Sequence, residues 1–584
     1  MTEEGTPVGG DRRATWAWRL TLPLAFLVAL ALRLPAVTAG YPYLNYVDEG
    51  HVLHPVRKLL ATGIWEPREN NYPALPIRAI AAAARVAAAV AKPATATRLR
   101  ADLARGGAYD VVEPPELVVV ARGLSLLVSL GIVLVAGLYA RRLAGDAAGI
   151  VAALAAALVP ALVIRGAIVA VDGFATLFVL AAMACCSAVR HPRHWLPLVA
   201  AGACCGLAAV SKYPAGLCGI AVVTCLGLAP WSAAERLRAA AVAAASGVVA
   251  AAAAMPSVVT RPGVVWERLV FQREMYTTLR VGSYWDQALR RAEWDLPFAG
   301  PELGATFLVL ATFGLLVAVV DRRWRRDAAG WIVFAVPLVA IHARYPFQAF
   351  RNFMPLAALG CVSVGVLAAW LGERVRKPLL VAAAAAAAIA VLFAPADVRY
   401  ARERAGVVDS RRQAIDWVVT HGGREVAGLA LAEVPFAPSE LARLGRRVRV
   451  APWNVARGEL LRARPRFVLA ADLRSEDGTL LIPAADRPWI AERYAERAVF
   501  GSEQGSLARI YFSGNELRIF VFERLPGARG RRPAGAGVAP PTGPSPAAAA
   551  RSSPTSSATG ANSSSGKLSG FSQNSPRPPA PHRS

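Results

Sequence analysis

Residues 121–178 have the sequence ARGLSLLVSLGIVLVAGLYARRLAGDAAGIVAALAAALVPALVIRGAIVAVDGFATLF, in which short charged turns separate long apolar runs. Runs of about 17–25 mostly apolar residues are long enough to cross a bilayer as helices. Ala, Leu and Val dominate these runs, and membrane helices tolerate the Gly and Pro that interrupt them. This stretch therefore predicts consecutive membrane-spanning helices joined by tight loops.

The same pattern extends over much of the 584-residue chain, which is 55% hydrophobic with a mean hydropathy of +0.39. It predicts an α-helical polytopic membrane protein with about eleven spans. We expect them at residues 16–37, 117–140, 147–164, 170–189, 195–210, 214–231, 239–256, 303–320, 328–342, 353–371 and 378–395. An alternative for the first span is a cleaved signal peptide, because Val37-Thr38-Ala39 resembles a signal-peptidase site.

The net charge of +25 comes mainly from short loops between apolar runs and from the C-terminal region. Loops such as DRRWRRD (321–327) and GERVRK (372–377) are dense in Arg and Lys, which marks the cytoplasmic side of a membrane protein. The charge therefore indicates orientation in a bilayer, and no nucleic-acid partner is expected. The seven cysteines lie inside or at the edges of apolar runs, which indicates buried thiols.

This orientation divides the chain into four regions. Residues 1–15 form a cytoplasmic tail, and residues 16–395 form the membrane domain. The membrane domain includes a first extracytoplasmic loop at 38–116, which has an amphipathic helix at 75–91. Residues 396–526 form a small extracytoplasmic α/β domain, and the Pro-, Ser- and Ala-rich residues 527–584 are expected to be disordered.

The α/β domain is predicted from four segments. Residues 409–421 are expected to form a helix with Asp409 as its N-cap. Strands are expected at 425–432, 466–473 and 517–523.

Charged residues recur at the outer ends of the spans. They are the adjacent pair Asp48–Glu49, then Asp172, Lys212, Arg344 and Arg351. Each alone has an ordinary explanation: a solvated loop, a helix N-cap, or a cation that extends to lipid headgroups. Together they lie at one membrane depth. Carboxylates beside cations there indicate a site that binds a phosphate while a base activates a nucleophile.

These residues resemble the polytopic GT-C glycosyltransferases, in particular the protein-mannosyltransferase and lipid A aminoarabinose-transferase group. The resemblance covers about residues 16–400, and residues 121–178 are the most family-like stretch. The other matching segments are ALRL (31–34), YVDEGH (46–51), NNYPALPIRAI (70–80), VSKYPAG (210–216) and FRNFMPLAAL (350–359). Asn352 stands where the family pattern has tyrosine.

The resemblance implies inverting transfer of a sugar from a polyprenyl-phosphate donor to a protein, lipid or glycan acceptor at the outer face of the cell membrane. Asp48 would be the general base, and Glu49 would bind the acceptor or position Asp48. Asp172 would orient the donor sugar or the cations around it. The other donor-binding or phosphate-binding residues that it implies are Lys212, Arg351, Arg165, Arg344, Tyr213 and Tyr72.

No cofactor is required by the sequence, but a divalent metal is an alternative. Asp48, Glu49, His51 and His54 have a spacing that could ligate such an ion, and some relatives bind one. Two other functions stay open. The chain could be a secondary transporter, whose sites usually lie near the membrane midplane, or a non-catalytic envelope-assembly protein.

Overall fold

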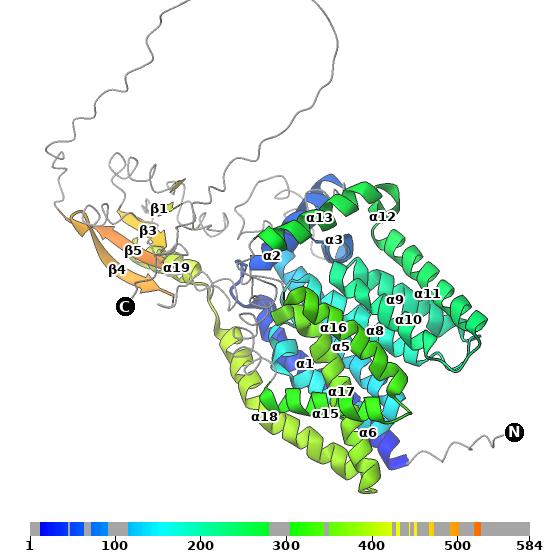
Figure 1. The fold of residues 1–584 in the computed structure, drawn as a ribbon. Coiled ribbons are helices and arrows are strands. Elements are labelled where there is room, and N and C mark those ends of the chain that lie inside the picture. Colours follow the sequence, from blue (N-terminus) through cyan, green and yellow to red (C-terminus); the bar gives the residue numbers. More distant parts are fainter. Residues whose placement is uncertain are drawn as a thin grey trace, which may run out of the picture. The chain divides into compact units, whose positions relative to one another are not determined.

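The computed structural model describes most of the helical region and part of the C-terminal domain (Figure 1). The described residues are 12–44, 47–63, 72–90, 115–278, 304–343, 350–422, 428–431, 443, 449–451, 466–471, 491–501 and 519–526. The expected tail at 527–584 lies outside this part of the chain, as do most residues of the expected tail at 1–15.

Each of the eleven expected spans coincides with a helix. The helices at these positions are α1 (Arg12–Thr38), α5 (Glu116–Ala144), α6 (Asp146–Leu158) with α7 (Pro160–Ile164), α8 (Val171–Ser187), α9 (Trp195–Ala209), α10 (Cys218–Gly227), α11 (Ala233–Ala254), α15 (Ala305–Val320), α16 (Arg325–His342), α17 (Met354–Arg374) and α18 (Pro378–Gly406). Within the described part of the chain, five helical segments are long and apolar enough to cross a membrane on their own. The chain is therefore a multi-pass membrane protein, as the apolar runs predicted.

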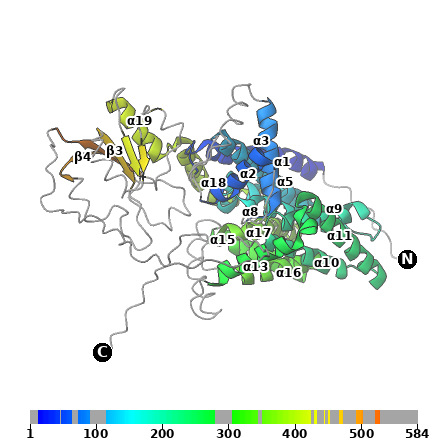
Figure 2. The same ribbon diagram turned by 90° about the horizontal axis from the view of Figure 1, so that it is seen from above.

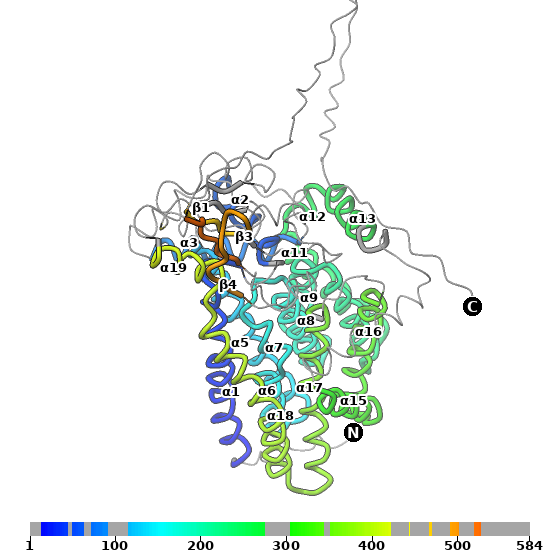
Figure 3. Tube along the Cα trace, turned by 90° about the vertical axis from the view of Figure 1, so that its left-hand side faces the viewer, coloured from blue at the N-terminus to red at the C-terminus, as the bar shows by residue number. Residues whose placement is uncertain are grey.

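Shorter helices connect the spans. They are α2 (Val47–Thr62), α3 (Ala74–Val90), α12 (Ser257–Thr260), α13 (Pro262–Thr278) and the 3₁₀ helices η3 (Tyr213–Leu217) and η4 (Phe350–Phe353). The views in Figures 1 and 3 agree that α2, α3, α12 and α13 lie at one end of the helical bundle. The amphipathic helix expected at 75–91 corresponds to α3, which packs its apolar face against α2 and α5.

Small residues allow the spanning helices to approach closely. Gly202 and Gly206 lie about one turn apart on α9, against the backbone carbonyls of Ala243 and Gly247 on α11. A Cβ atom at either glycine would collide with the carbonyl opposite. This spacing is typical of membrane helices, which associate through close van der Waals packing because the lipid offers no hydrophobic driving force.

The span expected at 147–164 is broken into two helices. Val159 has an extended backbone, with ψ of 120°, and Pro160 has no N–H to continue the hydrogen bonding of α6. The chain restarts as α7, ends it at Ile164, and continues through residues 165–170 to the start of α8. This break sets the path of the segment that leads to Asp172.

The C-terminal domain pairs a helix with a mixed sheet (Figure 2). The helix is α19 (Ser410–Gly422), and the strands are β1 (Gly428–Leu431), β2 (Arg449–Ala451), β3 (Phe467–Ala471), β4 (Tyr494–Phe500) and β5 (Ile519–Arg524). The strand order is β2-β1-β3-β5-β4, parallel between β2, β1 and β3 and antiparallel for β5 and β4. Apolar residues of α19, including Ile415 and Val418, pack on Phe467 and Val521.

The expected helix and the three expected strands of this domain correspond to α19, β1, β3 and β5. Asp409 caps α19, because its carboxylate accepts a hydrogen bond from the Arg411 N–H at 2.9 Å. The sequence prediction missed β2 and β4.

Candidate functional site

Three separate segments of the helical bundle bring charged side chains together. Lys212 donates hydrogen bonds from its Nζ to Asp172 Oδ1 and to Asn352 Oδ1. Arg351 Nε lies 3.5 Å from Asp172 Oδ2. Asp172 is only 3% exposed, so its charge is held largely out of water and needs these cations. The structure thus brings together three of the residues that the sequence singled out.

Local structure places each of these groups. Asp172 lies in the first turn of α8, where the helix dipole favours a carboxylate. Lys212 has an extended backbone between the end of α9 and the start of η3. Arg351 and Asn352 lie in η4, directly before α17.

A small cavity of about 10 Å³ lies beside this cluster. His342 at the end of α16 lines it, together with Asp172, Lys212 and Asn352. The His342 ring is buried and meets the ring of Phe353 edge-on, with 5.5 Å between the centroids. This volume is about that of one water molecule. A larger anionic ligand could therefore enter only if the cations turn away from Asp172.

Glu49 forms a second buried ion pair, with Arg122 of α5. The guanidinium is bidentate: Arg122 Nε lies 2.8 Å from Glu49 Oε1, and Nη2 lies 2.7 Å from Oε2. Arg122 also donates to the carbonyls of Ala39, at 2.8 Å, and Tyr43, at 3.3 Å. Both charged side chains are 1% exposed. This pair therefore fixes α2 and the end of the first span to α5.

The two ion-pair clusters share one connecting segment. The Val169 N–H donates to Glu49 Oε1 at 3.3 Å, and Asp172 follows three residues later in the chain. Asp48 precedes Glu49 in the first turn of α2, although its side chain lies outside the described part of the structure. The helix that carries Asp48 is thereby tied to the segment that carries Asp172.

The other expected site residues have different surroundings. Arg165 ends α7 beside Tyr400 of α18, whose hydroxyl donates to the Ile164 carbonyl at 3.2 Å. Tyr213 begins η3, next to Lys212 in the chain. Tyr72 meets the ring of His51 edge-on, at 6.3 Å between centroids. Arg344 lies outside the described residues.

Two of the residues that could ligate a metal ion have other partners. Both oxygens of Glu49 are bound to Arg122, and the ring of His51 packs on Tyr72. Burial lowers the pKa of His51 below its ordinary value, and neighbouring His54 lowers it further. Among the described side chains, no group of three or more His, Cys, Asp and Glu could hold a metal ion. A divalent ion stays a prediction from the resemblance.

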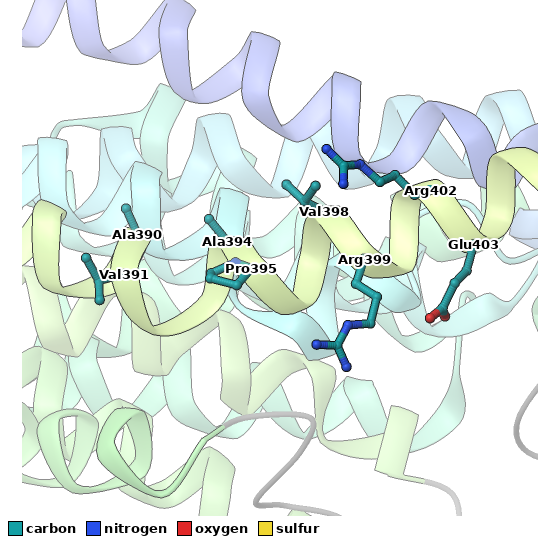
Figure 4. Close-up of a pocket in the computed structure, with 8 residues that line it drawn as sticks. All are labelled: Ala390, Val391, Ala394, Pro395, Val398, Arg399, Arg402 and Glu403. Atoms are coloured by element: carbon teal, nitrogen blue, oxygen red, sulfur yellow. The ribbon is translucent and has the colours of Figure 1, made fainter.

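A larger groove of about 700 Å³ runs along α18 and is lined by residues between 390 and 403 (Figure 4). Its lining combines apolar residues such as Val391 and Val398 with Arg399, Arg402 and Glu403. Arg399 and Arg402 both line the groove, although their guanidinium groups turn in different directions in this view. None of the expected site residues lines this groove.

The sequence analysis did not name three members of these clusters as site residues: Asn352, His342 and Arg122. Asn352 and His342 are uncharged, and nothing in their spacing marks them as neighbours of Lys212. Arg122 lies inside an apolar run, where a charged residue is rare and usually has a partner. That position in the run was the available signal.

The family match covers three of the residues in these clusters. Residues 117–259, which include Arg122, Asp172 and Lys212, match the family described as dolichyl-phosphate-mannose-protein mannosyltransferase. No curated protein sequence matches the chain significantly.

Several solved structures resemble the fold. ArnT from Cupriavidus metallidurans bound to undecaprenyl phosphate is 14% identical, with a TM-score of 0.51 over 87% of this chain and 97% of that one. The oligosaccharyltransferase AglB from Archaeoglobus fulgidus, in complex with an inhibitory peptide and a dolichol-phosphate, is 11% identical. Its TM-score is 0.47 over 87% of this chain and 75% of that one.

The chain is thus similar to the mannosyltransferase family over residues 117–259 and has a fold like that of ArnT. The resemblance expected from the sequence is confirmed at this level.

Proposed function

We propose that this protein transfers a sugar from a polyprenyl-phosphate donor to an acceptor hydroxyl, with inversion, at the extracytoplasmic face of the cell membrane. One observation carries the proposal: Asp172, Lys212 and Arg351 converge from three segments, and Val169 ties that site to the helix of Asp48. The acceptor belongs to the lipids, glycans or proteins of the cell envelope.

The cations suit a lipid-phosphate leaving group. Departure of the sugar leaves negative charge on the phosphate, and fixed cations stabilise that charge without a general acid. Lys212 offers a compact ammonium and Arg351 a planar guanidinium, both suited to phosphate oxygens. Asp172 holds both cations in place before the donor binds, and the phosphate then takes over part of their hydrogen bonding.

Asp48 is the general base in this mechanism. It accepts the proton of the acceptor hydroxyl as the oxygen attacks the anomeric carbon on the face opposite the phosphate. A carboxylate is a stronger base when it is partly removed from water, as at the end of a membrane helix bundle. Glu49 is the positioning residue, because its bidentate contact with Arg122 fixes the turn of α2 that carries Asp48.

The distribution of basic loops supports a site on the extracytoplasmic side. Arg323 donates to both Asp321 and Glu373 between the ends of α15 and α17. This basic cluster lies by the C-terminal end of α8, where Arg326 donates to the Cys186 carbonyl, and Asp172 lies at the other end of that helix. Basic loops mark the cytoplasmic face.

Mass spectrometry of envelope lipids, glycans and proteins from a deletion strain tests the proposal. We expect one class to lose a pentose or hexose, and the wild-type gene to restore it. Lys212→Met should fail to restore it, with transfer lowered about 100-fold or more because a cation is lost from the leaving group. Arg261→Met, which removes an exposed cation between α12 and α13, is the matched control and should restore it. An unchanged set of sugars in the deletion strain would contradict the proposal.

A further inference from the structure

Arg33 is a fully buried cation in α1 that the proposed mechanism does not use. Its guanidinium donates hydrogen bonds to one hydroxyl and four carbonyls, which come from α1, α5, α6 and α7. The acceptors are Ser129 Oγ at 3.0 Å, Leu162 O at 3.3 Å, Ala29 O at 3.2 Å, Ala157 O at 2.9 Å and Ala156 O at 3.0 Å. Asp397 of α18, which is 1% exposed, lies near enough to interact with it electrostatically.

Two of these bonds replace what the break after α6 removes. In a continuous helix the N–H of residue 160 would bond to the carbonyl of Ala156, and that of residue 161 to the carbonyl of Ala157. Pro160 has no N–H, and the extended Val159 diverts the chain. Arg33 Nη2 and Nη1 donate to these two carbonyls instead. A carbonyl without a donor inside a bilayer is costly, so the break depends on Arg33.

The loop after the break also rests on this side chain. A Cβ atom added to Gly166 would lie 2.6 Å from Arg33 Cδ and 2.7 Å from Arg33 Nε. It would also lie 2.8 Å from Ser129 Oγ. Only a glycine therefore fits between this loop and the guanidinium. Gly166 therefore packs against Arg33, three residues before Val169 and six before Asp172.

We propose that Arg33 is a positioning residue. Its guanidinium holds the α6–α7 break and residues 165–170 in the shape that presents Arg165 and Asp172 to the lipid phosphate. The effect of Arg33 on the position of residues 165–170 is inferred from the contacts alone. Its effect on phosphate binding rests on the proposed function.

The test separates support of the backbone from positioning of the loop. Arg33→Met leaves the carbonyls of Ala156 and Ala157 without donors, so the purified protein should melt several degrees lower. Adding Pro160→Ala returns an N–H to the Ala156 carbonyl and allows α6 to continue. The double variant R33M/P160A should therefore regain most of the lost melting temperature without regaining the loop. Arg19→Met, which removes an exposed cation from the same helix, is the matched control.

Two measurements show whether residues 165–172 keep their place in the double variant. Hydrogen exchange of residues 165–172 should be faster in R33M/P160A than in the wild type, because the Val169 N–H loses its fixed place at Glu49. The Kd for undecaprenyl phosphate should rise about tenfold or more, since small displacements of binding groups have large effects. Wild-type exchange in the double variant would overturn the inference.

Gly166→Ala provides an independent test if R33M/P160A does not fold. The added methyl group should speed exchange in residues 165–172 and raise the Kd. Gly219→Ala in α10, where no atom lies within 4 Å of the added Cβ, should change neither. Unchanged exchange in G166A would overturn the inference. If the wild type itself does not bind undecaprenyl phosphate, the proposed donor class fails, while the exchange data still decide the role of Arg33.

Discussion

At the scale of single residues, the buried Glu49–Arg122 ion pair gives a prediction about the free energy of unfolding. Removing one partner of a buried pair leaves an uncompensated charge and typically costs about 3–5 kcal/mol. We predict that Glu49→Met and Arg122→Met each lower the free energy of unfolding by about this amount. The double variant should lose less than the sum of the two.

A double-mutant cycle by thermal unfolding in detergent measures this coupling. Arg85→Met, which removes an exposed cation from α3, is the control for the loss of a positive charge alone. If the two single variants are as stable as the wild type, the pair does not hold α2 in place.

His51 predicts a dependence of stability on pH. Burial lowers its pKa in the folded protein below the ordinary value of about 6.5, so the unfolded chain binds a proton first as the pH falls. The stability that neutral His51 contributes is complete above about pH 6.5 and is lost as the pH falls below that value. We predict that His51→Phe, which retains a ring against Tyr72, weakens this decline.

The melting temperatures of the wild type and of His51→Phe, measured between pH 7.5 and 5, test this prediction. His54→Phe is the companion variant, because His54 also lowers the pKa of His51. The same acid dependence in H51F and in the wild type would rule out this role.

The charged residues Asp172, Lys212 and Arg351 could be singled out from the sequence because charges of both signs recur at the outer ends of the spans. Their partners could not. Asn352 is an uncharged residue 140 positions from Lys212. Arg122 pairs with Glu49 across 73 positions. Such pairings depend on how the helices cross, and the apolar pattern of one span does not determine that.

At the scale of elements, run length predicted the spanning helices but not their interruptions. The run at 147–164 has the length of one span, yet Pro160 divides it. The strand β2 was missed because three residues are too short to show an alternating pattern. In β4 the polar pair Glu496–Arg497 interrupts the alternation, and the pairing with β5 is irregular there.

The contact between α9 and α11 gives a prediction at this scale. Gly206→Val would press a branched side chain against the Gly247 carbonyl and separate the helices. We predict a loss of about 1–3 kcal/mol, typical of overpacking in a tight interior. Lys212 follows α9 directly, so binding of undecaprenyl phosphate should weaken as well. Thermal unfolding measures the loss of stability in Gly206→Val, with Gly219→Val as the control. Equal stability of these two variants would contradict the prediction.

At the scale of the whole molecule, the orientation in the membrane is the claim to test. Arg322 is exposed at the turn between α15 and α16, and Arg402 is exposed near the far end of α18. α18 begins at Pro378, so 24 residues at about 1.5 Å each place residue 402 about 36 Å farther along the helix. The two positions therefore lie on opposite sides of a bilayer.

Cysteines at these positions test the orientation, in a protein whose seven native cysteines have been replaced. A membrane-impermeant maleimide added to intact cells should label Arg402→Cys and leave Arg322→Cys unlabelled until the membrane is opened. Labelling in the reverse order would place the candidate site in the cytoplasm.

The most direct test of the account is the rate of sugar transfer by purified Asp48→Asn protein in proteoliposomes. The donor would be the polyprenyl-phosphate sugar identified from the deletion strain. Loss of a general base should lower the rate about 10²- to 10⁴-fold, while the melting temperature and the Kd for undecaprenyl phosphate stay at wild-type values. A transfer rate near that of the wild type would contradict the assignment of Asp48 as the base.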